Sequence, residues 1–225
     1  MNKSAILALG LLSASPLIAR PARADLVGVA GVLQAAAPPS SAVKGAAKND
    51  LAAMIFQESS GVAAGDNGLA VDIASPGTYT GGGPAPDPGM IAAGTVLRSY
   101  LLHSDPVSPI VRYRGTVTFG TPVLGVEILT ASLLGTDARF GHAGTAYDSD
   151  VSRGLEGPSA PATQDFITLS GDRRMIAFDF RTGTSVDDIR VFTAVPEPSS
   201  LALAGVGLLA LATAGRRGLA RTRRD

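Results

Sequence analysis

The central part of the chain, residues 25–194, is divided into short apolar segments by glycine, proline, aspartate and serine, and this punctuation limits the folds open to it. The segments are rich in β-branched or aromatic residues and cover residues 54–57, 69–73, 95–103, 111–119, 123–130, 166–170, 175–181 and 189–193. The chain lacks the regular alternation of strand and helix patterns that is typical of α/β proteins. We therefore expect an all-β domain over residues 25–194, an antiparallel β-sandwich of jelly-roll type.

Three stretches of this domain carry more specific predictions. The alternation in residues 111–119 places valine, tyrosine and phenylalanine on one face of a strand and arginine and threonine on the other. Residues 166–169 and 175–180, joined by a turn with Gly-Asp, predict a β-hairpin. Residues 34–50 are rich in alanine and proline and are expected to form a loop with a short helix.

Composition excludes several kinds of site. The chain has no cysteine, which excludes disulfides, thiolate metal centres and a cysteine nucleophile, and its 2 histidines exclude a histidine-rich metal site. The formal net charge of zero hides an uneven distribution. Residues 1–24 carry +3, residues 25–198 carry −7 and residues 199–225 carry +4. An acidic central domain repels phosphate groups, so we expect no nucleic-acid partner.

The N-terminus has the features of an export signal. Lys3 precedes an uncharged apolar run, residues 5–12, which is about as long as a signal-peptide core and too short to span a bilayer. Ala22 and Ala24 form the small-x-small pattern at which signal peptidase cuts. The alternative is an amphipathic first helix, but apolar residues cover all sides of this segment. We therefore expect residues 1–24 to be a signal peptide and the central domain to be exported.

The C-terminal segment, residues 195–225, has three parts in order. It begins with a stiff sequence in which prolines exclude helix and central strand: Val195, Pro196, Glu197 and Pro198. An uncharged stretch follows, whose larger apolar residues are Leu201, Leu203, Val206, Leu208, Leu209 and Leu211. The end is a cationic tail with Arg216, Arg217, Arg221, Arg223 and Arg224.

The order of these parts predicts a short transmembrane helix with a cytoplasmic basic stop. Its 14 to 17 residues would reach about 21–25 Å as a helix, which a thinned bilayer or snorkelling side chains can accommodate. The arginines would remain on the cytoplasmic side. The alternatives are an ordinary C-terminal tail anchor and a buried helix of a soluble domain, and the latter leaves the terminal arginines unexplained.

The succession of Pro196-Glu197-Pro198, apolar span and arginine cluster resembles a PEP-CTERM sorting signal. The resemblance covers about 30 residues of the chain and implies that exosortase, a membrane-embedded cysteine transpeptidase, is a partner. It further implies an inner-membrane-anchored precursor that is cut near the motif and passed to the cell surface or the extracellular space. Members of this family occur in bacteria that produce exopolysaccharide and biofilm, so exopolysaccharide is a further expected partner.

Candidate metal ligands occur in two acidic stretches. Asp148, Asp150 and Glu156 place oxygen ligands in one loop, as a calcium site requires, although the spacing is not that of an EF-hand. Asp66, Asn67 and Asp72 make a weaker second candidate. Solvated turns are the alternative for both. The sequence predicts no bound cofactor other than this calcium candidate.

No catalytic residue is predicted. His103, Ser104 and Asp105 carry the chemistry of a hydrolase triad, but neighbours on a strand point to opposite faces and cannot form the relay. Glu127 paired with an aspartate is the remaining hydrolase hypothesis. We therefore expect a surface or matrix protein without catalytic activity. The alternative is a calcium- or carbohydrate-binding module on the same sorting signal, with Tyr79 and Tyr147 as the candidate aromatic contacts for sugar.

Overall fold

The structure, a computed structural model, describes residues 26–34, 37–157, 164–183 and 185–195. The expected cleavage site at Ala22 and Ala24 lies outside these residues, and so do the expected transmembrane helix and the arginine tail. Within the described part of the chain, no helix is both long enough and apolar enough to cross a membrane.

Two five-stranded sheets form most of the domain. The first sheet is antiparallel throughout and contains, in spatial order, β1 (Leu26–Ala30), β9 (Val111–Phe119), β13 (Met175–Thr182), β12 (Phe166–Leu169) and β6 (Gly77–Tyr79). The second sheet contains β10 (Val123–Glu127), β14 (Asp187–Ala194), β8 (Val96–Ser104), β4 (Ala53–Ala63) and β2 (Val32–Gln34). Only β2 and β4 run parallel in this second sheet.

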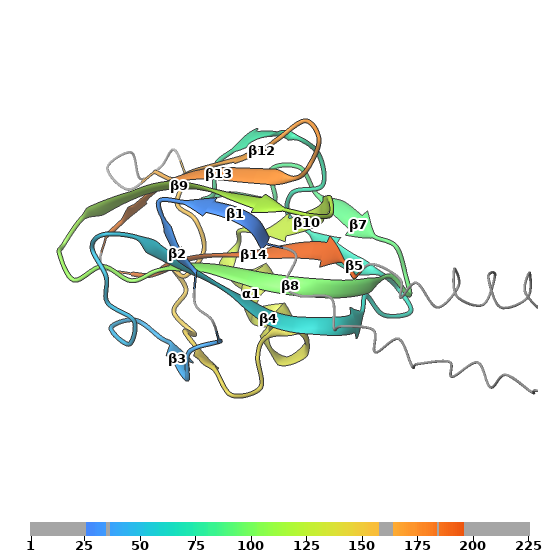
Figure 1. The fold of residues 1–225 in the computed structure, drawn as a ribbon, viewed down its shortest axis with the longest axis horizontal. Coiled ribbons are helices and arrows are strands. Elements are labelled where there is room, and N and C mark those ends of the chain that lie inside the picture. Colours follow the sequence, from blue (N-terminus) through green and yellow to red (C-terminus); the bar gives the residue numbers. More distant parts are fainter. Residues whose placement is uncertain (1–25, 35–36, 158–163, 184, 196–225) are drawn as a thin grey trace, which may run out of the picture.

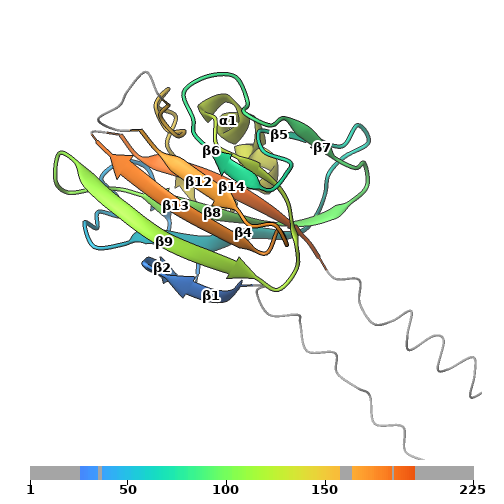
Figure 2. The same cartoon turned by 90° about the horizontal axis from the view of Figure 1, so that it is seen from above.

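The two sheets face each other across one hydrophobic core (Figure 1). The second sheet directs Tyr100 of β8 and Val191 of β14 into this core, and the first sheet contributes Phe119 and Phe178. The rings of Tyr100 and Phe119 lie 5.3 Å apart between their centroids and join the two layers. Viewed from above, β1 lies beside β9 at one edge of the first sheet (Figure 2).

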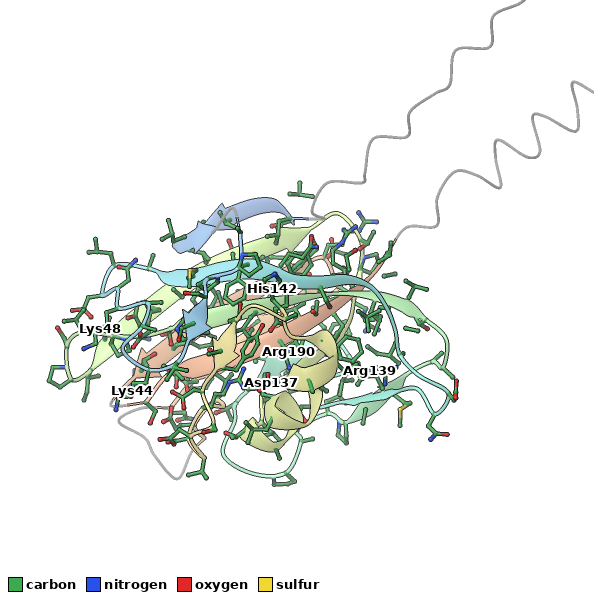
Figure 3. The ribbon with its side chains drawn as sticks, turned by 90° about the horizontal axis from the view of Figure 1, so that it is seen from below. Lys44, Lys48, Asp137, Arg139, His142 and Arg190 are labelled. Carbon is green, nitrogen blue, oxygen red and sulfur yellow. The ribbon has the colours of Figure 1, made fainter. Side chains whose placement is uncertain are left out.

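A single helix, α1 (Thr130–Phe140), covers the outer face of the second sheet among the described residues. Figure 3 shows it in front of the second sheet, with Asp137 on the helix close to Arg190 of β14. Because side chains alternate along a strand, β14 sends Val191 into the core and Arg190 and Phe192 toward this helix. Two short pairs complete the fold: β3 (Ser41–Ala42) with β11 (Ala146–Tyr147), and β5 (Leu69–Val71) with β7 (Gly89–Ile91).

Several local predictions are confirmed. β9 has the predicted bounds, and its tyrosine, second valine and phenylalanine are buried as the alternation requires. The predicted hairpin is β12 and β13, which pair antiparallel through a turn at residues 170–174. Arg173 occupies the left-handed region in that turn, with φ of 59°.

Two predictions are wrong. The strand expected over residues 123–130 ends at Glu127, because the carboxylate of Asp72 accepts hydrogen bonds from the amides of Ile128 and Leu129 at 2.7 and 2.9 Å and turns the chain out of the sheet. The short helix expected within residues 34–50 is absent from residues 37–50. This stretch forms β3 and turns instead, and its amides at Gly45 and Ala47 donate to Asp105.

Both ends of the described domain lie at the same end of the molecule. Leu26, at the start of β1, pairs with Phe119, the last residue of β9. Thr193, near the end of β14, pairs with Val123, the first residue of β10. Phe119 and Val123 flank the short connection between β9 and β10, so the N-terminal and C-terminal strands meet there.

Candidate functional site

The outer face of the second sheet carries a buried network of charged side chains beneath α1. Arg153 and Arg190 are both 0% exposed and are the largest fully buried side chains of the described chain. Burying a guanidinium is costly unless charge and hydrogen bonds compensate it. The hydrogen-bond and ion-pair partners of each arginine therefore show whether this region is a functional site or a structural ion-pair network.

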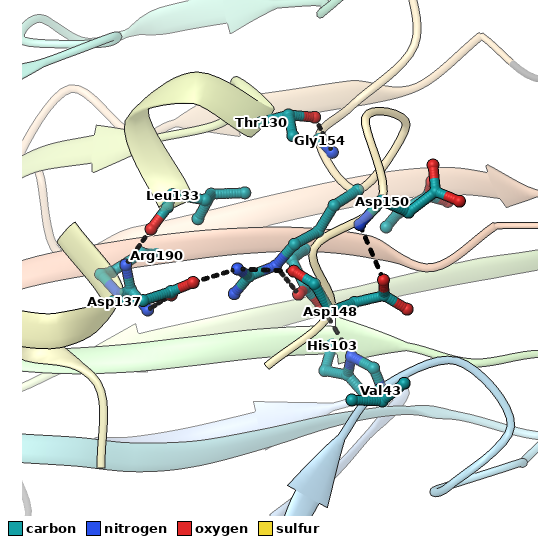
Figure 4. Close-up of polar contacts among 12 residues, drawn as sticks. Val43, His103, Thr130, Leu133, Asp137, Asp148, Asp150, Gly154 and Arg190 are labelled. Atoms are coloured by element: carbon teal, nitrogen blue, oxygen red, sulfur yellow. Dashed lines mark hydrogen bonds and ion pairs between the residues drawn. The ribbon is translucent and has the colours of Figure 1, made fainter. Parts of the chain in front are cut away.

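Arg190 is held by two acidic side chains on different elements. Its Nε and Nη2 donate to both carboxylate oxygens of Glu58, at 2.7 and 2.8 Å, in the bidentate geometry that arginine favours. Nη2 also donates to Asp137 of α1 at 2.7 Å, and Nη1 donates to the Leu133 carbonyl at 3.1 Å and to the Thr136 hydroxyl at 2.5 Å. Figure 4 shows Arg190 between Asp137 and Leu133. One strand residue thus binds the helix at three points.

Arg153 continues the network on the other side of Asp137. Its Nη1 donates to Asp137 and its Nε to Asp188, both at 2.6 Å. Asp188 also bonds Nδ1 of His103 at 2.7 Å. Burial raises the pKa of Asp188, but His103 and Arg153 lower it more, so the carboxyl lies below its ordinary range. The ring of Tyr147 lies 5.2 Å from the Arg153 guanidinium carbon and covers this part of the network.

Glu127 ends in the same region, with one oxygen 3.6 Å from Nη1 of Arg190 and 2.6 Å from the Thr136 hydroxyl. Burial nevertheless raises the pKa of Glu127 to about 8, because Arg190 only partly offsets the loss of hydration. Its Oε1 is buried without a hydrogen-bond partner among the described residues. The carboxyl group is therefore largely protonated at neutral pH, despite the nearby arginine.

Both arginines of the network are buried and paired with carboxylates, and only Asp137 at its centre is partly exposed. We therefore interpret the network as a structural feature that fixes α1 on the sheet. The hydrolase residues of the sequence do not assemble there. Ser104 bonds Thr182 at 2.6 Å, and Asp105 accepts backbone amides of a loop. Nε2 of His103 has no partner among the described residues, and Glu127 is 0% exposed.

A second cluster lies at the opposite end of the second sheet from the chain termini. One carboxylate oxygen from each of Glu156, Asp165 and Asp187 lies within 4.8 Å of the others. Asp187 begins β14, whereas Asp165 directly precedes β12. Asp165 and Asp187 are 0% exposed, and Glu156 is half-buried. We call these three residues the acidic group.

Ionising all three carboxyl groups of the acidic group at once would cost much free energy. Burial raises the pKa of Asp165 to about 8, and the neighbouring Glu156 raises it further against two backbone hydrogen bonds. Burial also raises the pKa of Asp187 well above its usual value, and both other members of the group add to this. Like charges this close in a buried place must be neutralised by protons or by a cation.

Comparison with known proteins concerns the C-terminal segment. A family model for the PEP-CTERM protein-sorting motif matches residues 194–217. The chain carries a PEP-CTERM motif. No curated protein and no solved structure matches the chain. The PEP-CTERM motif implies an exported protein that is targeted to exosortase, a membrane-associated partner.

The PEP-CTERM motif begins where β14 ends. Ala194 is the last residue of β14, and the amide of Val195 still donates to the Val96 carbonyl at 3.0 Å. β14 lies between β10 and β8 in the second sheet. The three motif residues after Val195, Pro196 to Pro198, lie outside the described residues. The domain therefore reaches the first proline of the PEP-CTERM motif without an intervening linker.

The calcium candidates predicted from sequence are only partly brought together. Asp148 accepts the amides of Lys44 and Asp150, each at 2.8 Å, and Asp150 accepts the amide and hydroxyl of Ser152. Asp150 thus serves a local turn, whereas Asp148 also holds the distant loop at Lys44. Of the three predicted ligands, only Glu156 belongs to the acidic group of the described chain.

The remaining candidates have structural contacts as well. Asp72 fixes the start of α1, while Asp66 is exposed. Tyr79 and Tyr147 are half-buried, with Tyr79 donating to the Ser75 carbonyl at 3.0 Å.

Sequence reasoning missed Asp165 and Asp187. Asp165 directly precedes the predicted strand 166–170, and Asp187 lies two residues before the predicted strand 189–193, so each carboxylate was expected near the end of a sheet. That position could have identified the two aspartates as candidates from the sequence. The clustering of the two residues with Glu156 could not have been predicted, because it depends on which strands lie side by side.

Proposed function

We propose that this PEP-CTERM protein is an exported cell-surface or extracellular-matrix protein that exosortase processes, and that it has no catalytic role. In this proposal the displayed body is a β-sandwich of jelly-roll type. The displayed domain is then associated with exopolysaccharide or biofilm. The observation that carries the proposal is the match of the PEP-CTERM model to residues 194–217, immediately after the last strand of a folded domain.

The position of the chain ends supports display. A precursor with a signal peptide before β1 and a sorting segment after β14 would have both of its membrane-directed ends at one end of the domain. The opposite end, where β8 joins β9 and β14 begins, would then point away from the membrane. A body with this layout can remain folded while its C-terminal segment is at the membrane.

The proposal is tested by replacing Pro196, Glu197 and Pro198 with alanine in the native host. We expect an uncut precursor that stays with the inner membrane, because exosortase would no longer find its motif. Cell fractionation with a domain-directed antibody and the mass of the released protein measure this. A matched control replaces the exposed Pro84 and Pro86 with alanine and should be processed normally. Normal processing of the motif variant would contradict the proposal.

A further inference from the structure

The acidic group gathers three carboxylates from two separate stretches of chain. Glu156 and Asp165 are 9 positions apart in the chain, and Asp187 starts β14, in contact with Thr182 at the end of β13. One oxygen of each lies within 4.8 Å of the others, at the end of the domain away from the chain termini. The fold therefore places oxygen ligands together that no sequence motif marks.

Two oxygens of this group have no protein partner among the described residues. Oδ1 of Asp187 is buried without a hydrogen bond, in a side chain that is 0% exposed, and Oε2 of Glu156 is buried and unpaired as well. A buried unpaired carboxylate oxygen costs free energy unless a ligand satisfies it. The unpaired oxygens are thus an observation separate from the clustering of charge.

Both oxygens of Asp165 and the second oxygen of Asp187 are held in place by hydrogen bonds. Asp165 accepts the Arg181 amide at 2.7 Å and the Glu156 amide at 2.9 Å, one on each carboxylate oxygen. Oδ2 of Asp187 accepts the hydroxyl of Thr182, which in turn bonds Ser104 at 2.6 Å. Supporting contacts of this kind orient ligating carboxylates at metal sites.

We propose that Glu156, Asp165 and Asp187 bind one calcium ion. Calcium takes six to eight oxygen ligands at about 2.3–2.6 Å, so two ligands on opposite sides of the ion lie up to about 5 Å apart. The spacing of the acidic group meets this limit. Water supplies the other ligands in this proposal.

The chemistry of the group distinguishes among metals. All three ligands are hard oxygens without histidine or cysteine, which suits calcium and magnesium rather than zinc or copper. Magnesium requires shorter, near-ideal octahedral geometry, whereas calcium tolerates an irregular set of ligands. Of the acidic group, Glu156 also lines a surface hollow, together with Gly82, Leu155 and Gly157.

The first test titrates calcium into the full-length chain, kept in mild detergent and freed of metal with a chelator. We expect a single saturable site by isothermal titration calorimetry, with a dissociation constant of about 0.1–1 mM, as in extracellular calcium modules. We also expect the melting temperature to rise as the site fills. Magnesium at the same concentration should give a clearly smaller rise. No isotherm and no shift at about 10 mM calcium would overturn the proposal, and equal responses would overturn its assignment to calcium.

The second test compares variants of the same chain. Asp187→Asn should weaken calcium binding at least about tenfold, because the ligand loses its charge. Glu156→Gln should weaken binding by the same factor. Because Glu156 is half-buried, this second substitution is less disruptive to folding. The control Asp150→Asn alters an exposed carboxylate outside the group and should bind like the parent chain. Unchanged binding in Glu156→Gln, or loss of binding in Asp150→Asn, would overturn the assignment.

Discussion

Glu127 lies 3.6 Å from an Arg190 nitrogen, yet its pKa is raised to about 8. Arg190 already donates to Glu58 and Asp137, and this leaves little of its charge to offset the desolvation of a third carboxyl. At the scale of single residues, burial thus decides the charge of a group more strongly than one neighbour does. The protonated form of Glu127 also reduces the negative charge crowded beneath α1.

The protonation of Glu127 predicts a pH dependence of stability. Between about pH 4.5 and 8 the folded chain holds a proton that the unfolded chain has released, so the free energy of unfolding falls as pH rises, by at most about 1.4 kcal/mol per pH unit. Glu127→Gln removes this contribution. The free energy of unfolding of this variant should equal that of the parent chain near pH 4.5. The difference in favour of the variant should grow up to about pH 8 and stay constant at higher pH. Urea unfolding followed by circular dichroism measures the two curves, and parallel curves would contradict the prediction.

At the scale of elements, α1 depends on residues that other elements supply. Its N-cap residue, Leu129, makes no side-chain cap, and Gly135 lies in its interior. Asp72 replaces the missing cap: one oxygen accepts the amides of Ile128 and Leu129, and the other accepts the Ser132 hydroxyl at 2.7 Å. The helix is therefore held by a carboxylate from the end of β5 and by Arg190 from β14.

Asp72→Ala should release the start of α1. We expect a loss of about 2–3 kcal/mol in the free energy of unfolding, because two backbone amides lose their acceptor in a buried place. Hydrogen exchange of the α1 amides should quicken more than that of β9. The control Asp66→Ala removes an exposed carboxylate from the preceding loop and should change neither measurement. Equal exchange rates in α1 for both variants would show that Asp72 does not hold the helix.

The dependence of α1 on remote residues explains why sequence patterns predicted some elements and not others. β9 and the hairpin of β12 and β13 were predictable because alternation and turn residues are local signals. The residues of α1 have few apolar side chains at helical spacing, and the partners that stabilise it lie far away in the chain. The positions of the predicted calcium ligands likewise depend on the fold. Asp148 and Asp150 are close in sequence, but each accepts backbone amides and neither belongs to the acidic group. Glu156 meets Asp165 and Asp187 through the fold.

At the scale of the whole molecule, the two ends of the domain meet beside the β9–β10 connection, and this is testable by energy transfer. The chain has 0 cysteines, so labels introduced at Val27→Cys and Val195→Cys have no native competitor. We expect high transfer between them. The control pair Val27→Cys and Val107→Cys places the second label beyond the far end of β9, whose 9 residues span about 30 Å. Higher transfer in the control pair would contradict the fold.

The position of β14 between two antiparallel neighbours determines how the domain responds to a pulling force at its C-terminal end. A pull on the C-terminal segment enters β14 along its axis at Val195, and the ladders to β10 and β8 are then loaded in shear. Many hydrogen bonds share that load at once, whereas an edge strand peeled from its end gives way one bond at a time. In the proposed surface display, a load applied through the C-terminal segment is therefore carried by both ladders of β14 together.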